Sequence, residues 1–209
     1  MRITRTANAG ILLELDGSRI LLDGVCGQIS PYLATPERVR QTLRQHYPDV
    51  VAITHRHGDH CDPAFEAEYE KYTGKTVVDP TFVGSTVQSG AIRVSAVSSR
   101  HIGKADCPHV SYVIEGSRCV WFTGDAAPSQ WKSKRDLPKP DVLIAPFAYA
   151  TTEAAWRMTR ELDPKAVVLL HLPEKSFDPA GLWTAVEQTV GQTPWVFIPE
   201  MEGFVEIDF

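Results

Sequence analysis

Residues 54–62 read Thr-His-Arg-His-Gly-Asp-His-Cys-Asp and follow directly after the apolar run at residues 50–53. Imidazole nitrogen and carboxylate oxygen bind zinc and its first-row neighbours, and Gly58 gives the backbone the freedom that a turn at a strand end needs. A surface loop in which these residues cluster by chance is the competing interpretation, but crowding ionisable groups without a charged partner is costly. The stretch therefore predicts a metal site, whose first candidate ligands are His55, His57, Asp59 and His60.

The composition is that of a single globular domain, which we predict to span residues 1–209. No Pro/Gly/Ser-rich linker, low-complexity tract or internal repeat divides the 209 residues. Lysine and arginine number 21 against 26 aspartates and glutamates, which gives a net charge of −5. This balance offers no electrostatic footprint for nucleic acid or for an anionic membrane, so the expected partner is a small-molecule substrate.

The four cysteines are scattered without a C-x-x-C pair, which is typical of free thiols in a reducing compartment. The first residues lack the apolar region of a signal peptide, and no apolar run approaches transmembrane length. These features predict a cytoplasmic protein. Cys61 stands beside the histidine cluster and could reach a metal, but a single thiol in this position is more often a packed apolar side chain.

The hydrophobic pattern predicts many strands and a few helices. Asp16-Gly17 is a two-residue hairpin signal between strands at residues 10–15 and 19–22. Helices are predicted at residues 36–46, 63–73, 152–162 and 179–190, and three of them begin with a cap residue followed by proline. Further strands are predicted at residues 49–54, 76–78, 91–97, 110–114, 119–123, 141–145, 166–170, 195–198 and 204–207. So many strands with few helices indicate two packed sheets that are covered by helices.

Three more ionisable residues stand where predicted strands end. His101 follows the strand at 91–97, Asp125 follows 119–123, and His171 follows 166–170. A single strand-end histidine or aspartate is more often a capping or surface residue. Together with the first cluster, however, they make five histidines and two aspartates, which is the set of ligands that two neighbouring metal ions require.

The order of these residues resembles the metallo-β-lactamase superfamily, in which an H-x-H-x-D-H cluster is followed by a histidine, an aspartate and a final histidine. Within it, residues 1–4, 20–23, 54–63, 122–125 and 168–171 look most like the small ascorbate-6-phosphate-lactonase-like metal-dependent hydrolases. The resemblance covers nearly the whole chain. It implies an α+β fold, a four-layer αββα sandwich of two mixed sheets covered by helices, with a dinuclear centre at one edge of the sheets.

The resemblance also implies a role for each candidate ligand. The first metal would be held by His55, His57 and His101, the second by Asp59, His60 and His171, and Asp125 would bridge the two. His109 is an alternative third ligand of the first metal, but His101 is favoured because it follows a strand. Asp23 resembles a family position that hydrogen-bonds a ligand, and the alternative is a turn aspartate before Gly24.

The expected reaction is hydrolysis of a small ester, lactone or phosphodiester by a metal-bridged hydroxide. Asp59 and Asp125 are the candidate catalytic residues because they offset the charge of the ions, and Asp59 could pass a proton to the leaving group. Zinc is the expected ion, with manganese or iron as alternatives. A nuclease of the same superfamily is the runner-up, which the acidic balance disfavours. A non-hydrolytic iron protein for redox chemistry or sensing is the other alternative, which the ligand set alone does not exclude.

Substrate contacts are expected from loops next to the ligands. One candidate region is the basic stretch Trp131-Lys132-Ser133-Lys134-Arg135, which could grip a phosphate or carboxylate, or could be a solvated loop. The chain is short for the family, so the pocket is either open or completed by a second subunit of a homo-oligomer. The other candidate contacts are Tyr32, Arg56, Phe147 and Tyr149.

Overall fold

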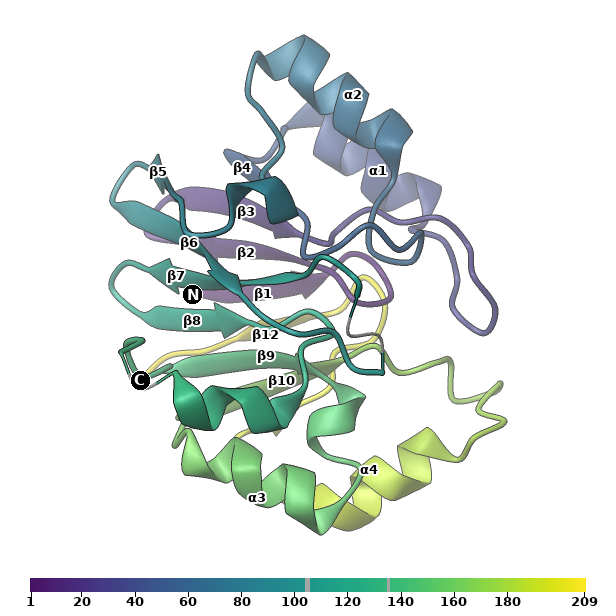
Figure 1. Ribbon diagram of the computed structural model, residues 1–209. Helices are drawn as coiled ribbons and strands as arrows, with labels where there is room; N and C mark the ends of the chain where they lie inside the picture. Colours follow the sequence, from purple (N-terminus) through teal and green to yellow (C-terminus); the bar gives the residue numbers. More distant parts are fainter. Residues whose placement is uncertain (104–105, 135) are drawn as a thin grey trace.

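The computed structural model describes residues 1–103, 106–134 and 136–209 and contains two β-sheets that pack face to face (Figure 1). The pairings in the first sheet are antiparallel except for the parallel pair β3 and β4. In spatial order this sheet contains β12 (Phe204–Glu206), β1 (Arg2–Arg5), β2 (Ile11–Leu15), β3 (Ser18–Leu22) and β4 (Val50–Ala52).

The second sheet is also mixed. Its strands from β8 to β11 are parallel, and those from β5 to β8 are antiparallel. In spatial order it contains β11 (Val196–Phe197), β10 (Ala166–Leu170), β9 (Val142–Pro146), β8 (Cys119–Phe122), β7 (Val110–Glu115), β6 (Ile92–Ser98) and β5 (Thr86–Ser89).

Two helices cover the outer face of each sheet (Figure 1). Helices α1 (Glu37–Gln45) and α2 (Pro63–Thr73) lie on the first sheet, and α3 (Glu153–Glu161) and α4 (Leu182–Val190) lie on the second. The predicted four-layer αββα sandwich is therefore confirmed. Short 3-10 helices complete the described elements: η1 (Pro80–Phe82), η2 (Pro128–Ser133) and η3 (Phe147–Tyr149).

Alternation of apolar side chains along the strands produces the layers. In β3, Ile20 and Leu22 point into the core between the sheets, whereas Leu21 packs under α1 and α2. In β8, Phe122 points between the sheets and Trp121 faces outward, toward the helices of the second sheet. Successive side chains of a strand point to opposite faces, so strands that are apolar at every position are buried on both faces. Burying each large apolar side chain contributes roughly 1.5–3 kcal/mol.

Most of the predicted elements form with small shifts at their ends. The hairpin at Asp16-Gly17 is present, and both residues adopt the positive φ that such a turn requires. Helix α2 has the predicted bounds, because Asp62 caps its first turn and Gly74 ends it with a φ of 69°. No helix in the described parts of the chain is both long and apolar enough to span a bilayer.

Three segments differ from the prediction. Helix α4 begins at Leu182, later than predicted, because Gly181 adopts a left-handed conformation and the Asp178 carboxylate accepts hydrogen bonds from the amides of Leu182 and Trp183. Residues 76–78 make only an isolated bridge, between Val78 and Ala52, in place of a strand. The edge strand β5 is missing from the prediction, because its partly exposed side chains give no buried apolar pattern.

Parallel pairing brings the ends of several strands to one side of the molecule. Strands β3 and β4 run the same way in the first sheet, and so do β8, β9 and β10 in the second. The segments that follow these strands gather on the side opposite the two chain termini (Figure 1). Residues that follow strands far apart in the sequence can therefore meet there.

Candidate metal centre

The loop that carries the first cluster is fixed by a buried aspartate at the end of β3. One oxygen of Asp23 accepts a hydrogen bond from the Thr54 amide at 2.7 Å. The other oxygen accepts one from the Thr54 hydroxyl at 2.6 Å and lies 2.8 Å from His60 Nδ1. Asp23 is 1% exposed and has a φ of 47°, a strained backbone region for a residue other than glycine. Asp23 thus contacts a candidate ligand, as the family resemblance implies, and is more than a turn aspartate before Gly24.

The second sheet holds the same loop from the other side. The buried hydroxyl of Tyr112 in β7 donates to the carbonyl oxygen of Ile53 at 2.7 Å, and the amide of Val110 donates to the carbonyl oxygen of Thr54 at 2.9 Å. Gly124 lies against Thr54 with a φ of 50°, and a Cβ at this glycine would come within 2.6 Å of the threonine side chain. The close approach therefore requires glycine just before Asp125.

Two pairs of imidazole nitrogens face one another inside this loop region. His55 Nε2 lies 2.9 Å from His57 Nδ1, while His55 Nδ1 is 3.0 Å from the Thr54 hydroxyl oxygen. His60 Nε2 lies 3.2 Å from His171 Nε2. Burial and the neighbouring histidines lower the pKa of His55 far below its ordinary value, so a proton is a poor bridge there. A cation between His55 and His57 is the better match.

Asp125 lies between the histidines that come from different strands. Its Oδ2 is 3.5 Å from the Nε2 atoms of His60, His101 and His171. Burial alone would raise the pKa of Asp125, but the His171 and His60 imidazoles lower it well below its usual range. Asp125 Oδ1 and His101 Nε2 are buried and have no hydrogen-bond partner among the described residues. Unpartnered buried acceptors are costly, and a bound cation would satisfy them.

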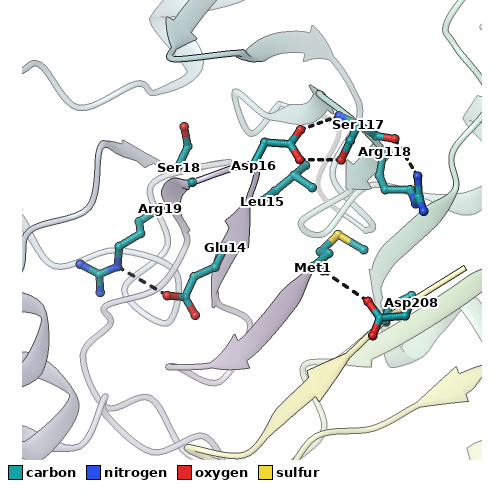
Figure 2. Close-up of a pocket in the computed structure, with 11 residues that line it drawn as sticks. Met1, Glu14, Leu15, Asp16, Ser18, Arg19, Ser117, Arg118 and Asp208 are labelled. Atoms are coloured by element: carbon teal, nitrogen blue, oxygen red, sulfur yellow. Dashed lines mark hydrogen bonds and ion pairs between the residues drawn. The ribbon is translucent and has the colours of Figure 1, made fainter.

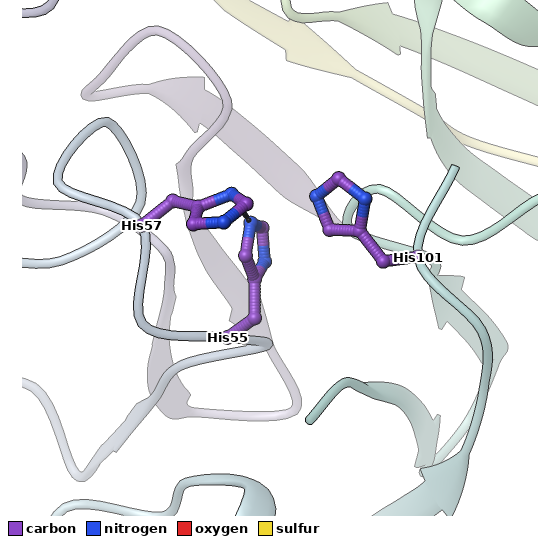
Figure 3. Close-up of side chains that lie close together, drawn as sticks. All are labelled: His55, His57 and His101. Atoms are coloured by element: carbon purple, nitrogen blue, oxygen red, sulfur yellow. Dashed lines mark hydrogen bonds between the residues drawn. The ribbon is translucent and has the colours of Figure 1, made fainter. Parts of the chain in front are cut away.

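The seven predicted ligands therefore meet at one place and form two groups with Asp125 between them. We call His55, His57 and His101 the first group (Figure 3) and Asp59, His60 and His171 the second group. In Figure 3, His101 comes from a different part of the chain and lies close to the other two rings, 4.7 and 4.9 Å away between centroids. His171 lies 3.3 Å from Asp59 and has a φ of 64°, so its backbone is strained at the centre.

A third set of ligand atoms, from Asp23, His55 and His60, is also close together. We assign Asp23 as an anchor because both of its oxygens already accept hydrogen bonds from Thr54, and one of them also contacts His60. A carboxylate that orients a histidine ligand in this way fixes the ring tautomer, so that the other ring nitrogen faces the cation.

The two alternative ligands lie outside these groups. The Nε2 atom of His109 accepts a hydrogen bond from the Asp125 amide at 3.1 Å, and its Nδ1 atom lies 2.7 Å from the Ser99 hydroxyl oxygen. His109 therefore positions the aspartate in the structure, and His101 is the histidine in the first group. Cys61 is buried in the core under α1 and α2, where burial raises the pKa of its thiol to about 11. A protonated thiol is a poor metal ligand.

Several neighbours of the centre were not predicted. Asn8 contacts His171 twice, through Nδ2 at 3.4 Å from the ring Nδ1 and through its carbonyl oxygen, which accepts from the His171 amide at 3.2 Å. Cys107 lies 3.9 Å from His57 Nε2. Neither residue stands in a motif, and Asn8 is 163 positions away from His171 in the chain. The sequence therefore offers no local signal for either contact.

The predicted substrate contacts separate into two classes. Tyr32 and Phe147 lie beside His171, at ring-centroid distances of 4.5 and 6.0 Å. Burial, followed by the charges of Asp125 and Asp59, raises the pKa of Tyr32 to about 12, so its phenol stays neutral. These two aromatic residues border the centre as predicted.

Two of the other predicted contacts are wrong. Trp131 and Tyr149 are buried under the second sheet, where the indole N–H donates to the tyrosine hydroxyl at 2.6 Å. Arg56 pairs with Glu66 and with Asp79, and its contact with a substrate stays a prediction.

The two described lysines of the basic stretch also lie away from the ligands. Lys132 and Lys134 line a separate pocket beside Met158, and Lys132 pairs with Glu161 at 3.3 Å. The solvated-loop interpretation therefore fits Lys132. Arg135 lies outside the described residues.

A further pocket lies at the opposite end of the first sheet (Figure 2). Its carboxylates have partners within the pocket: Asp16 accepts from the amide and the hydroxyl of Ser117, both at 2.6 Å, and Glu14 lies 3.9 Å from Arg19. Strand β3 runs from this pocket toward Asp23, so the whole length of the strand separates it from the ligands. We assign it no part in the metal centre.

An αββα sandwich with histidine and aspartate side chains clustered at one edge of its sheets is the arrangement expected of a metal-dependent hydrolase. The chain belongs to the β-lactamase superfamily, since the family model of the beta-lactamase superfamily domain matches residues 2–171. The predicted superfamily is thus confirmed, while the closer resemblance to lactonase-like members stays a prediction.

Individual relatives agree with this assignment. A UPF0173 metal-dependent hydrolase of Methanopyrus kandleri is 26% identical over 220 residues, covering 90% of this chain and 92% of the relative. An isothiocyanate hydrolase from Delia radicum gut bacteria has a TM-score of 0.70 at 15% identity, over 100% of both chains. A diiron β-hydroxylase from Streptomyces venezuelae has a TM-score of 0.62 at 15% identity, over 100% of this chain and 54% of that chain. The two structural likenesses show the shared fold alone.

Proposed function

We propose that the chain is a metal-dependent hydrolase with two divalent cations, preferably zinc, that cleaves a small ester, lactone or phosphodiester. The observation that carries the proposal is the set of unpartnered acceptors at the centre, Asp125 Oδ1 and His101 Nε2, beside the facing nitrogens of His60 and His171. Divalent cations would satisfy all of these atoms at once. The name of the Methanopyrus kandleri relative supports the same reaction class.

Each group of ligands would hold one cation. The first group offers three imidazoles, and the second offers two imidazoles and a carboxylate, with the Asp125 carboxylate between them. Divalent cations held there would lower the pKa of water and polarise the bond that is cleaved. The chain therefore needs neither a serine nor a cysteine nucleophile for this reaction.

The side chains of the centre have separate tasks. Burial raises the pKa of Asp59, but the hydrogen bond from His171 and the charges of His60 and His171 together hold the pKa below its usual value. Asp59 is therefore ionised at neutral pH, so it can accept a proton from water and return it to the leaving group. Asp23 and Thr54 orient His60 and His55, and Tyr32 borders the space in front of His171.

A redox or sensing function with iron is the second candidate. Histidine and carboxylate suit iron as well as zinc, and the diiron β-hydroxylase from Streptomyces venezuelae shares this fold.

We also propose that the protein works in the cytoplasm. Cys26, Cys61 and Cys119 form no disulfide, which is typical of a reducing compartment, and iron and zinc proteins both occur there.

The test combines metal analysis with a substrate panel. Protein purified from defined medium is analysed for zinc, manganese and iron, and visible spectra are recorded with and without oxygen. The zinc and manganese forms are then assayed with aryl esters, lactones and bis-aryl phosphodiesters. We expect about two metal ions per chain and turnover on at least one class. An iron absorption band that responds to oxygen, with no turnover in the panel, would establish the second candidate instead.

A further inference from the structure

A pocket of about 470 Å³ lies beside the metal centre. It lies between the segment that follows β3 and the segment that follows β10, both of which protrude on the same side of the molecule (Figure 1). Pockets of this size hold small organic ligands, and their linings are mostly apolar. The apolar part of this lining includes Tyr32, Leu33, Ala34, Leu172, Trp183 and Met201.

The pocket shares walls with the metal centre. The ring of Tyr32 lines the pocket and packs edge-on against His171 at 4.5 Å. Asn8 also lines the pocket, and its side-chain Nδ2 atom lies 3.4 Å from Nδ1 of the same His171 imidazole ring. The segment of Tyr32 is tied to the ligand loop as well, because the Gly27 amide donates to the Gly58 carbonyl oxygen at 2.8 Å. A ligand that fills the pocket would therefore end next to the second group.

The charges around the pocket disfavour an anionic ligand. Arg5 is 7% exposed and donates four hydrogen bonds, all to backbone carbonyl oxygens, at 3.2 Å each. Lys175 donates to Glu187 at 2.9 Å and lies over the Trp183 ring at 4.5 Å. The cations of the described lining are thus engaged, while Glu174 and Glu200 add negative charge. An anion buried here would therefore find no free cationic side chain among the described lining residues.

The rim of the pocket is apolar and partly open to solvent at Leu33, which is 45% exposed. Ile29 belongs to the same segment, is 44% exposed, and its side chain lies beside Gly58 of the ligand loop. Exposed apolar groups next to a polar centre are typical of a surface that receives a ligand.

We propose that this pocket binds the apolar acyl or aryl group of a neutral ester or lactone, whose carbonyl group then lies at the metal centre. The proposal rests on the proposed function and narrows its substrate class, since it disfavours phosphodiesters. In the reaction the oxygen of water bonds to the carbonyl carbon, and the C–O bond of the ester breaks. The alcohol leaves with the proton that water gives up, by way of the Asp59 carboxylate.

The first experiment compares 4-nitrophenyl esters of increasing chain length, from acetate through butyrate to octanoate, on the zinc-loaded protein. Each methylene group that enters the pocket should raise kcat/KM by about fourfold until the pocket is filled. Ala34→Trp places a large side chain in the lining, and it should lower kcat/KM for octanoate by about tenfold or more while acetate changes by less than about twofold. Val83→Trp is the matched control, because Val83 is 50% exposed and lies beside β5 at the other edge of the second sheet.

A second variant tests the same pocket in case Ala34→Trp does not fold. Leu33→Asp adds a charge at an exposed position of the lining, so the fold should be retained and only the longer esters should lose rate. Equal kcat/KM along the ester series in the unmodified protein would overturn the proposal. A preference for bis-aryl phosphodiesters that both variants leave unchanged would overturn it too.

Direct binding separates this proposal from the proposed function. Calorimetry with the non-hydrolysable 4-nitrophenyl octyl ether should show binding with a negative heat-capacity change, and Ala34→Trp should abolish it. Binding of this kind without turnover of any ester would leave the pocket assignment standing and contradict hydrolysis. Absence of binding to the unmodified, metal-loaded protein would overturn the pocket assignment, whatever reaction the centre catalyses.

Discussion

The two groups of ligands are held in different ways, although they lie side by side. In the second group all three residues are buried, and the carboxylate of Asp23 lies 2.8 Å from the Nδ1 atom of His60. Asn8 contacts both the ring and the backbone of His171. The second group is therefore part of the core, and its geometry is fixed when the sheets pack.

The first group depends more on loops. Only His55 is buried, while His57 and His101 are half-buried. The ring of His101 has the carbonyl oxygen of its own neighbour, Ile102, 2.5 Å from Nδ1, in place of a buried carboxylate. The difference indicates that the fold preorganises the second group, and it predicts that the geometry of the first group depends more on a bound cation.

The largest expected effect comes from the residue that contacts both groups. Asp125→Ala should reduce turnover by about a thousandfold, equivalent to about 4 kcal/mol, because it would remove the carboxylate between the two proposed cations. Metal content should fall from about two ions per chain to about one, as measured by elemental analysis. Asp208→Ala is the control, since the Asp208 side chain is 96% exposed at the far end of the sheet. If Asp125→Ala keeps two ions per chain, the bridging assignment is wrong.

The next effect tests whether Asp23 accounts for the rigidity of the second group. Asp23→Asn should weaken metal binding by about 10-fold to 100-fold, because His60 loses the charged partner of its Nδ1 atom. The free energy of unfolding should fall by about 2 kcal/mol, as measured by denaturant titration. Asp49→Asn is the matched control, because Asp49 accepts the Arg19 amide at 2.9 Å at the other end of β3. Unchanged metal affinity would show that the fold holds His60 without this carboxylate.

The pair His101 and His109 sharpens the description of the first group. His101→Ala should lower metal content by about one ion per chain, because it removes a ligand. His109→Ala should keep both ions, yet reduce turnover by about tenfold, because the Asp125 amide loses its acceptor at 3.1 Å. Elemental analysis and kcat measured on the same preparations separate the two roles. Loss of metal from His109→Ala alone would reverse the assignment of the two histidines.

Removal of metal should expose the difference between the groups directly. In a chelator titration we expect the ion of the half-buried first group to leave before that of the second group. The Tm should therefore fall in two steps, since each ion bound only by the native state adds about 3 kcal/mol when its concentration is about 100 times its Kd. Calorimetry at increasing chelator concentration gives the measurement. A single step, with both ions lost together, would mean that the two groups form one cooperative site.

Much of the fold follows from local patterns in the sequence. Strands such as β3 and β8 are apolar enough to be recognised, and the cap at Asp62 together with Gly74 fixes both ends of α2. The stretch at residues 54–62 indicates the centre because its ligands are adjacent in the chain. The remaining ligands could be predicted because they stand at strand ends, where parallel strands bring their following residues to one edge.

The surroundings of the centre could not be predicted in the same way. Trp131 follows Asp125 closely in the sequence, but η2 turns its side chain into the core beneath the second sheet. Asn8 and Trp183 come from distant parts of the chain, and only the packing of the sheets brings them to the pocket beside His171. Proximity along the chain gives no direction for a side chain, so pocket residues depend on the tertiary structure.

The smallest expected effect tests whether the basic stretch supports either group. Lys132→Ala should change kcat/KM by less than about twofold, because Lys132 is 60% exposed, pairs with Glu161 at 3.3 Å and lines a pocket apart from the ligands. Exposed ion pairs of this kind contribute little to stability, so the Tm should also stay nearly constant. The assay uses the best ester and an anionic aryl phosphodiester in parallel. A loss of rate confined to the anionic substrate would bring this stretch back into the site, and the centre would then be supported by a charged loop as well as by strand ends.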